Sequence, residues 1–421
     1  MYAEIIAIGD ELTSGQRLDT NTQWLSQRLA ENGIAVLYHT TVGDDLAANV
    51  RVFREAIERA DLILCTGGLG PTADDLTRQA IAETLGVDLV QDDPSLAHIE
   101  QLFSRRGRKM SERNRVQAMF PRGARAVPNP HGSAPGIDVD AARQGGGGGA
   151  ARIIALPGVP AEKREMWEQT VAGIVREMSG GKAIRHYCLK CFGVGESDLE
   201  GMLPDMIRRG REPTVGITVS RATITLRVSA RGETSEACYE AMQPTLQEMR
   251  QRLGKLVFGE QEDQLQDAVI RLLKERRKTL ATFECGSGGL LAEWLSEADP
   301  DRQCYRGGMV WRDFENLPPQ LANLSENAWE NENHHLQKQQ LQEAAEQLRP
   351  GFAADYALVL GAFPAVAAAG DAPPRVVYAL AGPQETACEA PPFAGHPDIL
   401  KHKTVKQALN LLRLKLLEAE T

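Results

Sequence analysis

The sequence predicts an α/β protein of several domains, with a parallel β-sheet in the first. Three observations predict this class. Apolar strand-like runs and helical patterns alternate three times between residues 3 and 85, which is typical of a parallel sheet covered on both faces. A glycine-rich turn at residues 66–70 joins the third strand to a helix, and the pattern changes after about residue 178. At 421 residues the chain is too long for a single core.

The first elements follow from hydrophobic spacing. Residues 3–8 form a short apolar strand, and residues 20–31 form a helix with apolar side chains on one face and Gly33 as its stop. Residues 34–42 read as the second strand, and the next helix has apolar residues at positions 46, 50, 53 and 57. Residues 61–65 form the third strand, and residues 76–85 form the helix after the glycine turn.

Composition and charge limit the classes of function. The chain is 42% hydrophobic and 25% charged, as in soluble globular proteins. Its net charge of −10 argues against a broad nucleic-acid-binding surface, and the basic run at residues 105–109 is expected to be a solvated helix end. Seven scattered cysteines indicate reduced thiols in a cytoplasmic protein. No apolar run is long enough to cross a bilayer, so no membrane partner is expected.

The motif TGGLGPTADDLT at residues 66–77 is the strongest candidate site. Glycines 67, 68 and 70 would let backbone N–H groups approach a ligand closely, and the following helix directs its positive end to the same place. This arrangement suits a phosphate. A divalent cation would explain why Asp74 and Asp75 lie beside an anion. The alternative, that one aspartate only caps the helix, stays open.

Acidic pairs follow all three predicted strands. They are Asp10–Glu11, Asp44–Asp45 and Asp74–Asp75. Ligands of parallel sheets bind beyond the carboxyl ends of the strands, so these pairs are expected to converge. Three ordinary helix caps explain the pattern almost equally well.

Further along the first domain, Asn114 and Gln117 lie three residues apart on a predicted helix, where the alternative is a polar surface stripe. Residues 129–136 form a rigid loop. Residues 137–140 and 152–156 would pair as a hairpin around Gln144 and the glycines at 145–149.

After the first domain the pattern becomes a small α+β module. It has a strand at 184–192, a helix at 199–209, a hairpin of strands at 214–220 and 223–230, and a helix at 234–253. The CxxC motif at 188–191 lies within its first strand and stands alone, so a metal role is not favoured. No chemistry is indicated in this module, and an interaction or spacer role is the default.

The third region begins with a helix at 261–277, a strand at 279–283 and a helix at 290–295. Strands at 356–360 and 375–380 and a helix at 405–417 complete an α/β domain. Cys285 at a helix start could be nucleophilic, but the sequence offers no evident base for it. The adjacent His334 and His335 lack a further ligand at helical spacing, so no metal site is expected there.

Over essentially its whole length the chain resembles the CinA family of competence/damage-inducible proteins. The motifs that carry the resemblance are GDEL at 9–12, GQ at 15–16, DTN at 19–21, TGGLGPTADDLT at 66–77, Asn114 with Gln117, NPHGSAPG at 129–136 and LPGVP at 156–160. The resemblance implies three domains, which we expect at residues 1–175, 176–256 and 257–421. They would be a molybdopterin-binding-like domain, a KH-type module without RNA binding, and an amidase-like domain.

The resemblance implies that the first domain is a metal-dependent pyrophosphatase that cleaves ADP-ribose to AMP and ribose 5-phosphate. The expected catalytic residues are Asp10, Glu11, Asp74 and Asp75, and the expected ligands of a Mg, Mn or Co ion are Asp10, Asp44, Asp74 and Asp75. The expected substrate-binding residues are Thr66, Gly67, Gly68, Gly70, Thr72, Asn114, Gln117, Asn129, Gly132 and Ser133.

The third domain departs from the family pattern. Active relatives have Glu-Ser-Cys-Thr-Gly-Gly with the serine as nucleophile, whereas residues 284–289 read ECGSGG. The family tyrosine falls on Arg312, its catalytic lysine on Leu317, and the later glycine-rich signature has become LGAFPA at 360–365. We therefore expect a degenerate site at Cys285 and Ser287 without amidase activity, because a nucleophile without its base loses most of its rate advantage.

Two alternatives to the hydrolase stay open. The same pocket would bind molybdopterin or a nucleotide without catalysis, or the chain would be a non-catalytic scaffold. In each case we expect a homodimer with a small-molecule nucleotide ligand and no direct nucleic-acid contact.

Overall fold

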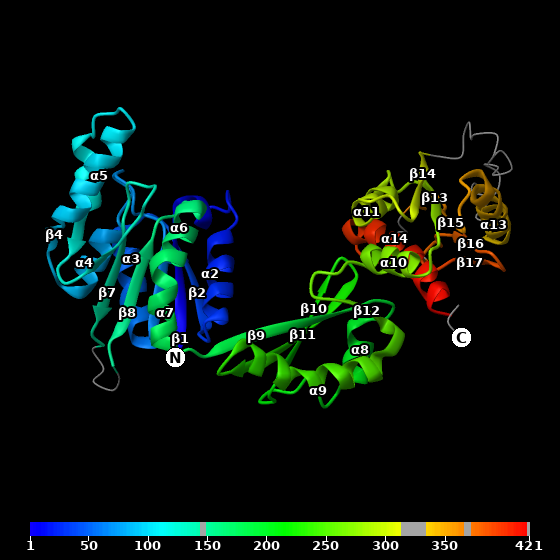
Figure 1. Ribbon diagram of the computed structural model, residues 1–421, viewed down its shortest axis with the longest axis horizontal. Coiled ribbons are helices and arrows are strands. Elements are labelled where there is room, and N and C mark those ends of the chain that lie inside the picture. The colour runs from blue at the N-terminus through cyan, green and yellow to red at the C-terminus, as the bar shows by residue number, and fades with distance from the viewer. Residues whose placement is uncertain (144–148, 313–333, 366–371, 419–421) are drawn as a thin grey trace. The chain divides into compact units, whose positions relative to one another are not determined.

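The computed structural model describes residues 1–143, 149–312, 334–365 and 372–418. Its contacts divide the chain into two compact units. The first consists of Met1–Arg185 with Ser229–Ala241, and the second of His186–Val228 with Met242–Thr421. Figure 1 labels the helices and strands of both.

The first unit is built on a six-stranded sheet with the order β2-β1-β3-β8-β7-β6. Strands β1, β2, β3 and β8 run parallel, and β7 and β6 are antiparallel to their neighbours. The bounds are β1 (Tyr2–Ile8), β2 (Ala35–Val42), β3 (Leu62–Thr66), β6 (Arg125–Val127), β7 (Gly136–Ala141) and β8 (Ala151–Leu156). The predicted parallel sheet and the predicted hairpin of β7 with β8 are confirmed.

Helices cover both faces of this sheet (Figure 1). They are α1 (Asp10–Thr13), α2 (Thr20–Glu31), α3 (Leu46–Arg59), α4 (Thr77–Leu85), α6 (Pro160–Met166), the π-helical turn η2 (Trp167–Val171) and α7 (Ala172–Ser179). Successive strand residues point to opposite faces, so Ile5 packs with Leu25 and Trp167 on one side, while Ile6 packs with Phe53 on the other. This double burial explains the continuous apolar runs of the strands.

A smaller substructure follows α4. It has β4 (Leu89–Gln91) paired with β5 (Met119–Pro121), the helix α5 (Asp93–Arg105) and the 3₁₀ helix η1 (Glu112–Ala118). The basic run at residues 105–109 is exposed at the end of α5, as predicted. In a 3₁₀ helix residues three apart are eclipsed, which brings Asn114 and Gln117 together. Both are buried, so the alternative of a surface stripe is wrong.

The middle part of the chain forms a four-stranded sheet with the order β10-β11-β9-β12. Its elements are β9 (Ala183–Cys191), α8 (Glu196–Met202), β10 (Thr214–Ser220), β11 (Thr223–Gly232), α9 (Ser235–Leu253), η3 (Gly254–Leu256) and β12 (Val257–Glu260). The helix predicted for residues 199–209 is wrong after Met202. Pro204 keeps the preceding Leu203 out of the helical region, which ends α8 there.

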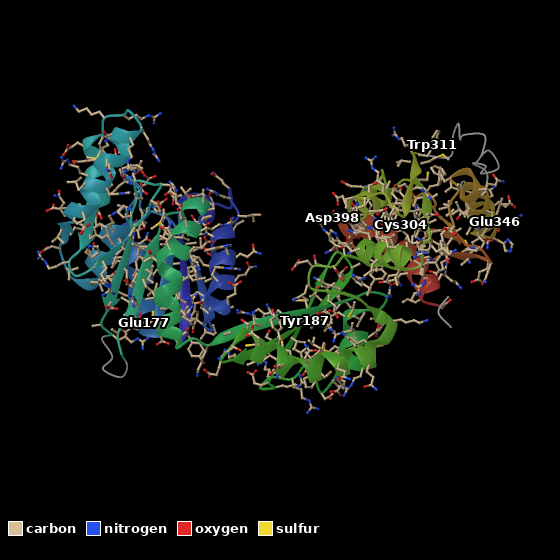
Figure 2. All side chains as sticks on the ribbon, viewed as in Figure 1. Glu177, Tyr187, Cys304, Trp311, Glu346 and Asp398 are labelled. Atoms are coloured by element: carbon tan, nitrogen blue, oxygen red, sulfur yellow. The ribbon has the colours of Figure 1, made fainter. Side chains whose placement is uncertain are left out.

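The C-terminal part has a five-stranded sheet with the order β14-β13-β15-β16-β17. Its elements are α10 (Leu265–Glu275), β13 (Leu280–Cys285), α11 (Leu290–Ala298), β14 (Tyr305–Trp311), α13 (His334–Gly351), β15 (Tyr356–Leu360), β16 (Tyr378–Ala381), β17 (Thr386–Glu389) and α14 (Pro397–Glu418). Cys304, labelled in Figure 2, is buried in this domain. The fold class is confirmed in all three parts, with a mostly parallel, an antiparallel and a mixed sheet.

Helix α14 is joined to the middle part by two buried cations within the second unit. Lys406 Nζ donates to Arg221 O at 2.9 Å and to Thr223 Oγ1 at 2.6 Å. Arg413 Nη2 donates to Lys255 O at 2.5 Å. These bonds attach α14 to the β10–β11 turn and to the segment before β12.

Two further observations concern membrane-spanning helices and disulfide bonds. The helices in the described ranges are all too short or too polar to cross a membrane. All seven cysteines fall within those ranges, and none of them is part of a disulfide.

Candidate functional site

The glycine turn after β3 is fixed against the neighbouring strands. Gly67 N–H donates to Leu156 O of β8 at 3.1 Å, and Thr77 Oγ1 donates to Gly67 O at 2.9 Å. Gly67 has a φ of 110°, and a Cβ at this position would lie 2.2 Å from Ile8 O. The position therefore requires glycine, because the turn passes directly over the end of β1.

Asp75 shapes the second half of this turn. Its carboxylate accepts hydrogen bonds from Gly70 N–H at 2.7 Å, from Thr72 N–H at 2.8 Å and from the Thr72 hydroxyl. The expectation that the Gly67 and Gly70 amides face a phosphate is thus wrong, because both donate within the protein. The Gly68 amide donates to no described residue and stays available to a ligand. The metal-ligand role of Asp75 stays a prediction that this geometry weakens.

A buried guanidinium lies beneath the turn. Arg78, in the first turn of α4, is 2% exposed and donates to Leu69 O at 2.7 Å and to Gly70 O at 3.4 Å. Its Nε has no hydrogen-bond partner, and it forms no ion pair within the described part of the chain. Burial lowers the pKa of Arg78 to about 10, and the charge of Asp75 opposes this shift. The positively charged Arg78 guanidinium is therefore buried directly against the backbone of the turn.

A cavity of about 420 Å³ opens over the turn. Ten predicted site residues line it: Glu11, Asp44, Thr66, Gly67, Gly68, Gly70, Asp74, Asp75, Gln117 and Ser133. Five predicted site residues do not: Asp10, Thr72, Asn114, Asn129 and Gly132. Sequence reasoning named no role for several other lining residues: Arg17, Asp19, Asn21, Gly158 and Glu162. The motif at residues 19–21 was part of the family resemblance, and it was the signal that could have identified Asp19 and Asn21.

The predicted residues outside the cavity support its walls. Asn129 Nδ2 donates to Ala134 O at 2.9 Å and to Glu162 Oε2 at 2.8 Å, and Gly132 N–H donates to Asn129 Oδ1 at 2.8 Å. These bonds build the loop that carries Ser133 to the cavity. Substrate contact by Asn129 or Gly132 stays a prediction.

The first two acidic pairs meet at the ends of β1 and β2. Asp10 N–H donates to Asp44 Oδ2 and Asp44 N–H donates to Asp10 Oδ1, each at 3.0 Å. By contrast, Asp45 is an N-cap, whose Oδ1 accepts from Ala48 N–H at 2.8 Å. The helix-cap alternative is therefore right for Asp45, whereas Asp10 and Asp44 join two strand ends.

The carboxylates of the three strand ends are close enough to interact. Partial burial raises the pKa of Asp44, and the charges of Asp10, Asp74 and Glu11 raise it further against the opposing hydrogen bond from Asp10. The nearby Thr72 side chain and the Asp74 backbone amide lower the pKa of Asp74, which favours its ionised form. Glu11, Asp44 and Asp74 line the same cavity, so negative charge from the three strand ends is concentrated there, and a shared metal role for these residues stays a prediction.

A preformed metal cage is not part of this arrangement. Within the described residues, no three His, Cys, Asp or Glu side chains are grouped so that they could hold an ion. The carboxylates expected to be ligands are partly engaged with backbone amides. Their mutual repulsion nevertheless suits a hard divalent cation whose remaining ligands are phosphate oxygens, since Mg²⁺ usually binds through one or two carboxylates plus the substrate.

The predicted degenerate site in the C-terminal domain is closed. Cys285 and Ser287 are fully buried. The Glu284 carboxylate accepts hydrogen bonds from the Ser287 hydroxyl, Leu291 N–H at 3.0 Å and Ala292 N–H at 2.9 Å, so it fills the N-terminus of α11. Position 317, which corresponds to the family lysine, lies outside the described residues.

These features define a class of protein: an α/β domain with a cavity at the carboxyl ends of its parallel strands, joined to an α+β module and a second α/β domain. Family models match all three parts. Residues 4–177 match "Probable molybdopterin binding domain", residues 186–259 match "Damage-inducible protein CinA KH domain", and residues 262–416 match "CinA C-terminal domain". The chain belongs to the CinA family.

Two relatives compared by sequence agree with this assignment. A protein of Symbiobacterium thermophilum named as competence-damage inducible is 40% identical over 312 residues, covering 74% of this chain and 72% of its own. A CinA-like protein of Dictyoglomus thermophilum is 36% identical, covering 75% of each chain. Among solved structures, the CinA protein of Thermoplasma acidophilum is 32% identical over 41% of this chain and 99% of its own, with a TM-score of 0.37.

Proposed function

We propose that the first domain hydrolyses a nucleotide diphosphate, with ADP-ribose as the substrate and AMP and ribose 5-phosphate as products. The observation that supports this most is the meeting of acidic residues from three strand ends with a glycine turn in one cavity. Neither feature alone would suit a diphosphate, because carboxylates repel it and the turn provides few free amides. Together with a shared cation they suit it well.

In this proposal one or two of the carboxylates of Glu11, Asp44 and Asp74, together with phosphate oxygens, would hold the divalent ion, which would neutralise phosphate charge and lower the pKa of the attacking water. The Gly68 amide and the positive charge of Arg78 beneath the turn favour the phosphate. Gln117 and Ser133 line the cavity and would contact the nucleoside or ribose. Asp10 holds Asp44 through the paired hydrogen bonds, and Asp75 holds the turn.

The test is incubation of the purified chain with ADP-ribose and Mg²⁺, Mn²⁺ or Co²⁺, followed by chromatographic detection of AMP. AMP formation that stops with a chelator and resumes with metal is the expected result. Formation no faster than in a blank without protein, with all three metals, would contradict the proposal.

The second candidate is binding without catalysis, which the name of the matching domain model supports. Molybdopterin or its adenylylated form would then occupy the same cavity. Calorimetry distinguishes the two functions: saturable binding of a pterin ligand with no turnover of ADP-ribose favours the second.

We further propose that the C-terminal domain has no amidase activity. Its support is the full burial of Cys285 and the occupation of the helix start by Glu284. Nicotinamide mononucleotide is expected to release no ammonia in the presence of the full chain. Release that is abolished by Cys285→Ala would overturn this.

A further inference from the structure

A second buried cation lies beside the cavity. It belongs to the helix that follows β8, whereas the acidic residues follow β1, β2 and β3. Lys163 of α6 is 1% exposed. It forms no ion pair with any residue in the described ranges. A buried ammonium without a carboxylate partner is costly to keep, so its remaining contacts indicate what it does.

The Lys163 ammonium points to the start of α2. Its Nζ lies 2.5 Å from Asn21 Oδ1 and 3.4 Å from Asn21 O, and 5.1 Å from the centre of the Trp24 ring. An ammonium has donors only, so it selects the oxygen end of the Asn21 side-chain amide.

The other end of that amide thereby faces the cavity walls. Asn21 Nδ2 donates to Gly158 O at 2.9 Å and to Thr66 Oγ1 at 3.3 Å, and the Thr66 hydroxyl donates to Pro157 O at 3.3 Å. Asn21, Thr66, Pro157 and Gly158 all line the cavity. One side-chain amide thus connects the start of α2 with the ends of β3 and β8.

We propose that Lys163 is a positioning residue for the nucleotide site. It fixes the orientation of the Asn21 amide, and through it the wall formed by the ends of β3 and β8, so that the cavity has the correct shape before the ligand arrives. The ligand assumed here, a nucleotide phosphate, rests on the proposed function. Lys163 itself does not line the cavity and is not a catalytic residue.

Neighbouring Arg164 provides a matched control. Its guanidinium lies 5.9 Å from the centre of the same Trp24 ring, but the hydrogen bond to Asn21 Oδ1 comes from Lys163 and not from Arg164. If Lys163 only packed on the Trp24 indole, removing the charge of Lys163 or of Arg164 would change ligand binding to a similar extent.

The experiment measures binding of AMP, which the proposed reaction releases and cannot cleave, to the full chain in the presence of Mg²⁺. Calorimetry compares wild type, Lys163→Met, Asn21→Leu, the double variant and Arg164→Met. We expect Lys163→Met and Asn21→Leu each to weaken binding about tenfold, the double variant to be no weaker than either, and Arg164→Met to bind as wild type. Should Lys163→Met fail to fold, Lys163→Leu, which also has no donor, replaces it in the same cycle.

A double variant about a hundredfold weaker than wild type would overturn the proposal, as would equal effects of Lys163→Met and Arg164→Met. If wild type binds no AMP, the decisive measurement is amide hydrogen exchange. Faster exchange in the peptides around residues 20–22 and 156–159 in Lys163→Met, and not in Arg164→Met, supports the positioning role, and unchanged exchange refutes it. Absence of ADP-ribose turnover contradicts only the proposed reaction.

Discussion

Asp10 and Asp44 exchange hydrogen bonds, each accepting the backbone N–H of the other at 3.0 Å. The two residues end adjacent parallel strands, and their pairing leaves one oxygen of each carboxylate for another partner. This pairing holds negative charge at the end of the sheet, where a ligand is expected.

Asp44→Asn should abolish most of the proposed activity with little loss of stability. Asparagine keeps an oxygen to accept from Asp10 N–H but removes the charge that would hold a cation. We expect the rate of AMP formation to fall about 100-fold or more. Asp45→Asn is the control, because Asp45 caps α3 and asparagine caps equally well. Equal activity of the two variants would contradict the assigned role of Asp44.

Asp75→Ala should destabilise the first unit. The substitution leaves the amides of Gly70 and Thr72 without their acceptor and removes the negative charge that favours the charged form of buried Arg78. We expect the free energy of unfolding to fall by about 1–3 kcal/mol, measured by denaturant titration. Unchanged stability together with lost activity would instead favour Asp75 as a metal ligand.

Two glycines with positive φ should respond differently to alanine. Gly67 would place a Cβ 2.2 Å from Ile8 O, whereas Gly86, at the end of α4, has no atom within 4 Å of its Cβ position. Gly86→Ala should cost about 1–2 kcal/mol, the cost of left-handed backbone. Thermal unfolding should show a clearly larger loss for Gly67→Ala, and similar losses would mean that the turn relaxes away from β1.

Burial predicts the order in which cysteines react. Cys188 and Cys388 are partly exposed, whereas Cys285 is fully buried. Iodoacetamide should therefore modify the first two before Cys285 in the native protein, as peptide mass spectrometry would show. Rapid modification of Cys285 would contradict the closed site.

The stability of the second unit should increase with pH above about 8. Burial lowers the pKa of Lys406 to about 8, and the charges of Arg221 and Lys190 contribute. Between this value and the ordinary lysine pKa of 10.5, the unfolded chain binds more protons than the folded one, so the free energy of unfolding rises with pH. Denaturant titrations from pH 7.5 to about 9.5 should show this slope in wild type and a smaller one in Lys406→Met. Equal slopes in wild type and Lys406→Met would show that Lys406 does not cause this pH dependence.

Local patterns predicted the bounds of several elements well. The helix at residues 20–31 and the strand at 356–360 have the predicted bounds, because apolar spacing and a glycine or polar stop defined them. The glycine turn was also identifiable as a site. What could not be predicted was which backbone amides remain free, since Gly67 donates to a strand that is 89 residues further along the chain.

The same limit applies to the cavity wall. Asn21 and Lys163 are 142 residues apart, and nothing in either segment shows that they meet. Local sequence marks helix starts and turns, but the partner of a buried polar group depends on the whole topology. For that reason the roles of Lys163 and Glu162 were missed, whereas Asp44 and Asp74 were identified as candidate site residues.

The strand order also constrains biosynthesis. Strand β3 lies between β1 and β8, yet β8 begins only at Ala151. When the first three strands have emerged from the ribosome, the partner of one edge of β3 has not yet been synthesised. That apolar edge therefore stays exposed until some ninety further residues have been translated. During that interval the growing polypeptide is a natural client for chaperones.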